Sequence, residues 1–111
     1  MTNEKLNNIL SVIAEKSKKI FGEKLDSIIL YGSYARGDYD EQSDVDIMII
    51  ADVFRQDINK YFENLLDLSS DLGLENDVVI SICIRDLQTF NKFYSVLPFY
   101  QTVLKEGVKV A

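Results

Sequence analysis

The sequence contains no histidine and no tryptophan, and it has one cysteine and one proline among its 111 residues. Without histidine, Ser-His-Asp and Cys-His catalysis are excluded, together with most transition-metal sites. The single cysteine, Cys83, cannot form a disulfide within the chain, and its apolar surroundings predict a small core residue. Any chemistry must therefore use carboxylates, hydroxyl groups, lysine, arginine and the backbone.

An excess of positive charge is also missing, because the formal net charge is −6. The chain thus lacks the broad basic surface that binds a phosphate backbone, and we expect no long nucleic-acid partner. No apolar run approaches the roughly 20 residues of a membrane span, and the N-terminal stretch does not read as a signal peptide. With the lone cysteine, these features predict a cytoplasmic protein that does not associate with a membrane.

The chain has the length of one domain, residues 1–111, without a repeat, linker or low-complexity segment. Apolar residues at helical spacing predict helices over residues 3–20, 53–72, 87–94 and 99–105. Apolar, β-branched runs predict strands over residues 25–31, 44–50 and 77–84. The short connection between the first two strands favours a small mixed sheet in an α/β (α+β) domain. We expect helices on one face of the sheet and chemistry on the other.

Two aspartates in the second predicted strand indicate a metal site. Asp44 and Asp46 are two residues apart, so both side chains leave the same face, roughly 6.5 Å apart along the strand. Two carboxylates on one face repel each other, and an uncompensated pair beside a buried strand tends to mark a functional site. Such a pair can hold two Mg²⁺ ions that bridge to substrate phosphates. The alternative is a pair of solvated residues at a strand edge.

The residues between the first two strands are suited to a phosphate. Gly32 and Ser33 follow the first strand directly, and backbone N–H groups at such a bend can cradle an anion, the equal alternative being an ordinary tight turn. Arg36 can pair with a phosphate or a carboxylate, although a surface arginine is the equal alternative. Asp77 opens the third predicted strand and is a candidate third ligand or base, the alternative being an ordinary strand-start residue.

The segment GSYARGDYDEQSDVDIMI, residues 32–49, resembles the signature of the polymerase-beta-like nucleotidyltransferases, and within them the minimal nucleotidyltransferases. That signature is Gly-Ser, ten residues, then Asp-x-Asp, and here residues 34–43 supply the ten. The tail, LPFYQTVLKEGVKV, is similar to the family's ending in an aromatic residue, an acidic-Gly pair and a short apolar strand.

The resemblance implies a role for each matching residue. Gly32, Ser33, Arg36 and Ser43 would bind the nucleotide, while Asp44, Asp46 and Asp77 would be the catalytic carboxylates and hold two Mg²⁺ ions. ATP would be the substrate. If Asp77 is displaced, the domain would bind a nucleotide without transferring it.

The resemblance also implies an acceptor. Minimal nucleotidyltransferases often act as antitoxins that attach AMP to a tyrosine of a HEPN-type ribonuclease toxin, and the short chain favours this reading over transfer to a small molecule such as an aminoglycoside. A cleft completed by a partner suggests a homo- or hetero-oligomer. The remaining alternative is a non-catalytic nucleotide-binding module that neutralises a partner by contact.

Overall fold

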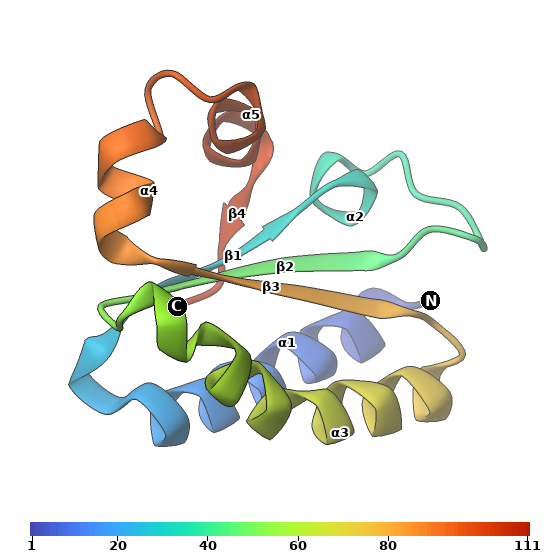
Figure 1. Ribbon diagram of the computed structural model, residues 1–111. Coiled ribbons are helices and arrows are strands. Elements are labelled where there is room, and N and C mark those ends of the chain that lie inside the picture. Colours follow the sequence, from blue (N-terminus) through green and yellow to red (C-terminus); the bar gives the residue numbers. More distant parts are fainter.

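Two long helices form one layer of the structure, a computed structural model that describes residues 1–111. Helix α1 (Asn3–Phe21) begins after Thr2, whose hydroxyl accepts a hydrogen bond from the backbone N–H of Lys5 at 3.2 Å. Helix α3 (Ile58–Asn76) follows a 3-10 turn at Arg55–Asp57. Both helices bury one apolar stripe against the same face of the sheet (Figure 1). Neither these nor the shorter helices combine the length and apolarity that a membrane crossing requires.

The sheet has four strands in the order β3-β2-β1-β4. Strand β2 (Val45–Ala51) lies at the centre, antiparallel to β1 (Leu25–Tyr31) and parallel to β3 (Ile80–Asp86). The short strand β4 (Val108–Lys109) pairs antiparallel with β1. The predicted mixed sheet is therefore confirmed, and β3 is left as an edge strand.

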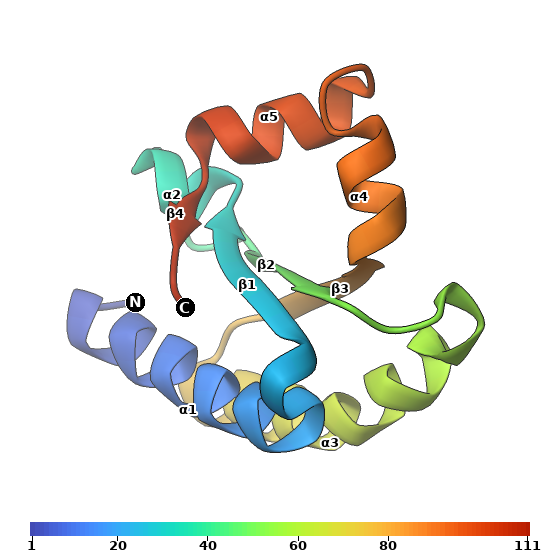
Figure 2. The same cartoon turned by 90° about the vertical axis from the view of Figure 1, so that its left-hand side faces the viewer.

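Helices cover both faces of this sheet rather than the single face that we expected from the sequence (Figure 2). Ile47 and Ile49 point into the core under α1 and α3, whereas Met48 and Ile50 belong to a second apolar cluster. That cluster is completed by α4 (Leu87–Phe93) and α5 (Pro98–Glu106), mainly through Phe90, Tyr100 and Val103. The open part of this face is consequently limited to the end of the sheet near α2 (Ser33–Arg36).

The bounds of several elements differ from the sequence prediction, and α3 begins at Ile58 rather than at residue 53. Helix α3 was expected to stop at Gly73, but it continues to Asn76. Glycine is required at position 73 because a Cβ atom there would overlap the carbonyl oxygen of Val78. Asp77 ends the helix in the left-handed region, with φ 52°. Strand β3 therefore begins at Ile80, three residues later than predicted, and Asp77 lies outside the sheet.

Candidate active site

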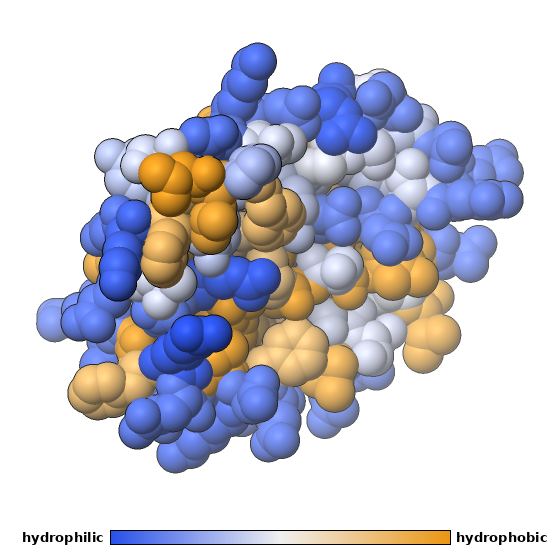
Figure 3. All heavy atoms as spheres, turned by 45° about the horizontal axis from the view of Figure 1, so that its top comes forward, coloured by the Kyte–Doolittle hydropathy of each residue, from blue (hydrophilic) through white to orange (hydrophobic).

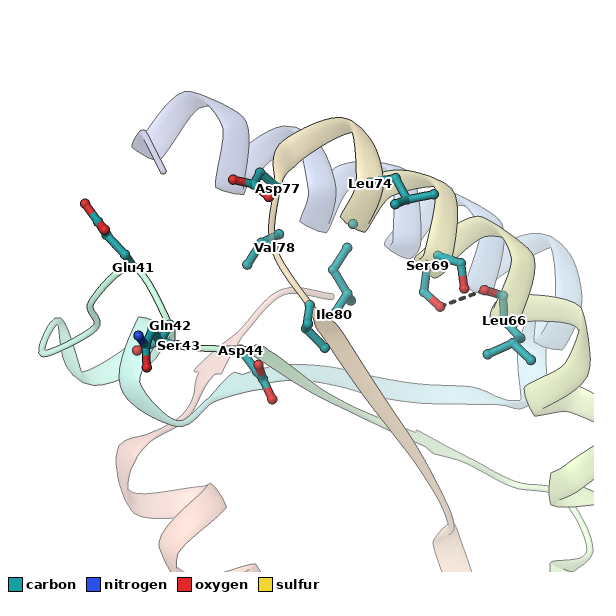
Figure 4. A pocket seen from close by; sticks show the side chains of 13 residues that line it. Glu41, Gln42, Ser43, Asp44, Leu66, Ser69, Leu74, Asp77, Val78 and Ile80 are labelled. Atoms are coloured by element: carbon teal, nitrogen blue, oxygen red, sulfur yellow. Dashed lines mark hydrogen bonds between the residues drawn. The ribbon is translucent and has the colours of Figure 1, made fainter.

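Asp46 is the second residue of β2 and lies between two partners in the sheet. Its register partners are Tyr31 on β1 and Ser81 on β3. Because side chains alternate along a strand, Asp46 shares a face with Met48 and opposes Ile47. Asp44 directly precedes β2 and is exposed, and its side chain points away from α3 (Figure 4). The structure thus brings Asp44 and Asp46 to the same side of the sheet, as the sequence predicted.

The bend after β1 lies directly against the Asp46 carboxylate. Gly32 caps α2 with φ 75°, a left-handed conformation that favours glycine. A Cβ atom at this position would overlap Oδ2 of Asp46. The Gly-Ser bend and the second aspartate therefore form one site, and the contact between them requires glycine for two independent reasons.

No side chain forms an ion pair with the Asp46 carboxylate. Burial raises the pKa of Asp46 above its ordinary value, and the charge of Asp44 raises it further, while Arg36 lowers it. Both ion pairs of the structure belong to Arg36, so no cation pairs with either aspartate. Two acidic oxygen donors that repel each other without a partner match what a hard divalent cation such as Mg²⁺ binds.

This electrostatic arrangement predicts how stability depends on pH when metal is absent. A folded-state pKa above the unfolded value gives stability that is present below about pH 3.9 and is lost as the pH rises through the raised pKa. In EDTA, the free energy of unfolding of the wild type should fall relative to that of Asp46→Asn between about pH 4 and pH 7. Urea titrations across this range measure the difference, and parallel curves would contradict the interpretation.

Arg36 ends α2 and is held from two directions. Its Nε donates to Asp38 at 3.2 Å, and its Nη1 donates to Glu106 at the end of α5 at 3.1 Å. A nucleotide-binding role for Arg36 was predicted from the sequence, but its contact with Glu106, 70 residues away in the chain, was not. Glu106 fixes the only cation that acts on the Asp46 carboxyl.

Loss of the ion pair between Arg36 and Glu106 should weaken nucleotide binding modestly. Both side chains of the ion pair are partly exposed, so Glu106→Gln is expected to reduce ATP affinity by at most about fivefold. Calorimetric titration with a non-hydrolysable ATP analogue measures this. Glu63→Gln on the exposed side of α3 is the matched control and should bind as the wild type does. An equal effect of both changes would mean that overall charge, rather than the position of Arg36, sets the affinity.

Two neutral side chains, Tyr31 and Cys83, lie on the same face of the sheet as Asp46. The Tyr31 hydroxyl is 3.6 Å from Sγ of Cys83 on β3, so the tyrosine reaches across β2. Its ring meets Phe99 of α5 edge-on, with ring centroids 5.7 Å apart. Burial raises the pKa of Tyr31 above its usual range and also raises that of Cys83. Both groups are consequently neutral at physiological pH, and Cys83 acts in packing, in line with its sequence interpretation.

The two predicted serines differ in their surroundings. Ser33 begins α2, and no hydrogen bond within the chain engages its backbone N–H. The hydroxyl of Ser43 instead accepts a hydrogen bond from the backbone N–H of Asp40 at 3.0 Å and lies 3.3 Å from that residue's carboxylate. Ser43 thus stabilises the loop before β2, whereas Ser33 has a donor free for a ligand.

Asp77 does not join the aspartate pair. It lies exposed at the end of α3, on the helix side of the sheet, whereas Asp44 points to the opposite side (Figure 4). No group of three or more acidic or cysteine side chains in the structure is placed to hold a metal ion. The register puts Ser81, rather than an acid, on the strand next to Asp46. The predicted position of Asp77 at the start of the strand is wrong, and its catalytic role stays a prediction.

The placement of Asp77 leads to a direct test of that role. With the carboxylate on the far side of the sheet, Asp77→Asn should change nucleotidyl transfer by less than about threefold. Transfer rates at saturating nucleotide and saturating acceptor compare this variant with the wild type. A loss as large as that of Asp44→Asn would show that Asp77 moves into the site during the reaction.

Comparison with known proteins identifies the class. Residues 10–110 match the family model described as a nucleotidyltransferase domain. Because the match spans almost the whole chain, the protein belongs to this family, and the resemblance seen in the sequence is confirmed. A protein from Methanocaldococcus jannaschii, provisionally named a protein adenylyltransferase, is 42% identical over 96 residues, which are 86% of each chain. A second one from that organism is 42% identical over 76 residues, or 66% of this chain and 75% of the relative.

Solved structures share the fold at lower identity. A crystal structure of a toxin–antitoxin with AMP-PNP superposes with a TM-score of 0.57 at 18% identity, over 95% of this chain and 72% of the other. A nucleotidyltransferase, provisionally so assigned, from Sulfolobus solfataricus gives a TM-score of 0.50 at 18% identity, over 96% of this chain and 82% of the other. These likenesses confirm the fold that the sequence predicted.

Proposed function

We propose that this chain transfers AMP from ATP to a hydroxyl group, in a reaction that depends on Mg²⁺ held by Asp44 and Asp46. The observation that carries the proposal is the contact of the Asp46 carboxylate with the bend at Gly32. A triphosphate bound at that bend would lie within reach of ions held by the aspartates. The nucleotidyltransferase family and the names of its relatives favour the same reaction.

Each residue of the site would contribute by position or charge. The free backbone N–H of Ser33 would donate to a phosphate oxygen, and Gly32 would allow the phosphate to approach the backbone closely. Arg36, held by Glu106, would add positive charge beside the triphosphate. Two divalent ions bound by Asp44 and Asp46 would supply activation of the acceptor hydroxyl and neutralisation of the leaving pyrophosphate.

The transfer of AMP forms one bond to phosphorus and breaks another. The acceptor oxygen forms a bond to the α-phosphorus of ATP, the bond from that phosphorus to the β-phosphate oxygen breaks, and pyrophosphate leaves. The chain contains no histidine, so the proton of the acceptor hydroxyl passes to a carboxylate of the site or to solvent. The protein's part in this scheme is positioning and charge stabilisation.

We propose a tyrosine of a HEPN-type toxin as the acceptor. The relatives from Methanocaldococcus jannaschii are named as protein adenylyltransferases, which favours a protein acceptor over a small molecule. The fold is shared with a toxin–antitoxin whose crystal structure contains AMP-PNP. In this role the chain would be the antitoxin.

Incubation with α-labelled ATP, Mg²⁺ and a HEPN-type protein encoded beside it tests this function. We expect the label on a tyrosine of the partner, release of pyrophosphate, and loss of both in Asp44→Asn and Asp46→Asn. Replacement of the labelled tyrosine by phenylalanine in the partner should abolish the labelling. Nucleotide binding without pyrophosphate release would instead identify a module that acts by contact alone, and release without labelled protein would favour a small-molecule acceptor.

A further inference from the structure

A groove of about 640 Å³ opens beside Asp44, between the loop that precedes β2 and the second half of α3 (Figure 4). Its apolar side includes Leu74, which is 83% exposed, and Val79, which is 62% exposed. Apolar atoms are visible at the surface near the right-hand edge of Figure 3, toward the end of the molecule where α3 meets β3 in Figure 1. Exposed apolar side chains gathered in one groove, rather than scattered singly, typically mark an interaction site.

The charges around the groove are all of one sign. Glu41, Asp44 and Asp77 line it, and no lysine or arginine does. Neither ion pair of the structure involves these three acids, so their charge is not neutralised within the chain. An occupant must therefore supply apolar contacts and positive charge together, which excludes a nucleic acid and favours a protein segment.

We propose that this groove binds a basic, apolar segment of the acceptor protein and so delivers its hydroxyl to the aspartate pair. The inference rests on the proposed function, because Asp44 belongs both to the groove lining and to the candidate active site. A segment lying along the groove passes the N-terminal end of β2, from which Asp44 points to the catalytic face. Side-chain contacts in the groove then select the substrate while the catalytic residues act on its hydroxyl.

The groove occupies the side of the sheet that a partner can reach. Strand β3 is an edge strand, and the residues leading into it, Asp77 to Val79, line the groove next to the end of α3. On the other side of β2, strand β1 is already paired with β4. Strand β3 thus presents an unpaired edge one strand away from Asp46, and the apolar, acidic groove lies at the start of that edge.

Binding of a synthetic peptide tests the groove independently of catalysis. The probe is a fluorescein-labelled peptide in which lysine and leucine alternate around a central tyrosine, titrated by anisotropy without ATP or Mg²⁺. Leu74→Lys places a positive charge on the apolar side and should weaken binding by about tenfold. Phe54→Lys is the matched control, since Phe54 is 73% exposed but lies outside this groove, and should bind as the wild type does.

Two further peptides separate the contribution of positive charge from that of apolar contacts. Replacement of every lysine by glutamate should abolish binding, and replacement of every leucine by serine should weaken it by about tenfold. Equal binding of the leucine-free peptide, an equal effect of the two protein variants, or no binding of the basic, apolar peptide would each overturn the proposal. Failure of these titrations would leave AMP transfer itself untouched, because pyrophosphate release in the presence of the whole partner tests that separately.

Discussion

Asp46→Asn is expected to lower the rate of AMP transfer by about a thousandfold or more, while the folded structure persists. A neutral amide binds a divalent ion much more weakly than a carboxylate does, and such ions contribute several kcal/mol to stabilising the transition state. The unrelieved repulsion between Asp44 and Asp46 is removed at the same time. Metal-free Asp46→Asn should therefore be at least as stable as the wild type at pH 7. Label transfer and thermal unfolding measure the two effects.

The matched control for this change is Asp52→Asn. Asp52 directly follows the opposite end of β2 and is exposed, so its replacement removes the same charge far from the bend at Gly32. Transfer by this variant should equal that of the wild type. Addition of Mg²⁺ should raise the unfolding temperature of the wild type and of Asp52→Asn but not of Asp46→Asn. Undiminished transfer by Asp46→Asn would end the assignment of this site.

Gly32→Ala is expected to abolish nucleotide binding and to destabilise the fold. The new methyl group would overlap Oδ2 of Asp46, so either the carboxylate or the bend must move. The positive φ of Gly32 adds backbone strain of about 1 kcal/mol for any residue with a Cβ. Titration with an ATP analogue and chemical unfolding should show both losses.

Gly37→Ala isolates the effect of strain alone. Gly37 also has a positive φ, 87°, but a Cβ there would meet nothing within 4 Å. This variant should lose about 1 kcal/mol of stability and retain nucleotide binding. If Gly32→Ala and Gly37→Ala had the same nucleotide affinity and the same stability, the contact between the bend and Asp46 would not be needed for nucleotide binding.

The sequence predicts the centre of this site well because the information is local. Asp44 and Asp46 are two residues apart, and the alternation of a strand suffices to place them on one side. Gly32 follows a buried strand directly, so its bend is also visible in the sequence. The family signature spans both and adds the nucleotide. The interpretation of these residues needed no knowledge of distant contacts.

What the sequence missed depends on contacts between distant segments. Glu106 approaches Arg36 across 70 residues, and its only sequence signal is an acidic residue before Gly107. The second apolar cluster, on the face that carries Asp46, arises because α4 and α5 fold back over β2, which periodicity does not show. Asp77 was misplaced because Gly73 was interpreted as a helix end, whereas it permits close packing by Val78.

Because β2 lies at the centre of the sheet, the position of Asp46 depends on the packing of the core. Ile47 and Met48 follow Asp46 immediately and are fully buried on opposite faces. A slip of this strand by one residue would exchange the two faces and drive the carboxylate into the apolar layer under α1 and α3. The acid is thus aligned by the same packing that holds the domain together. Random variation in these seven residues should therefore seldom yield folded but inactive protein, except at position 46 itself.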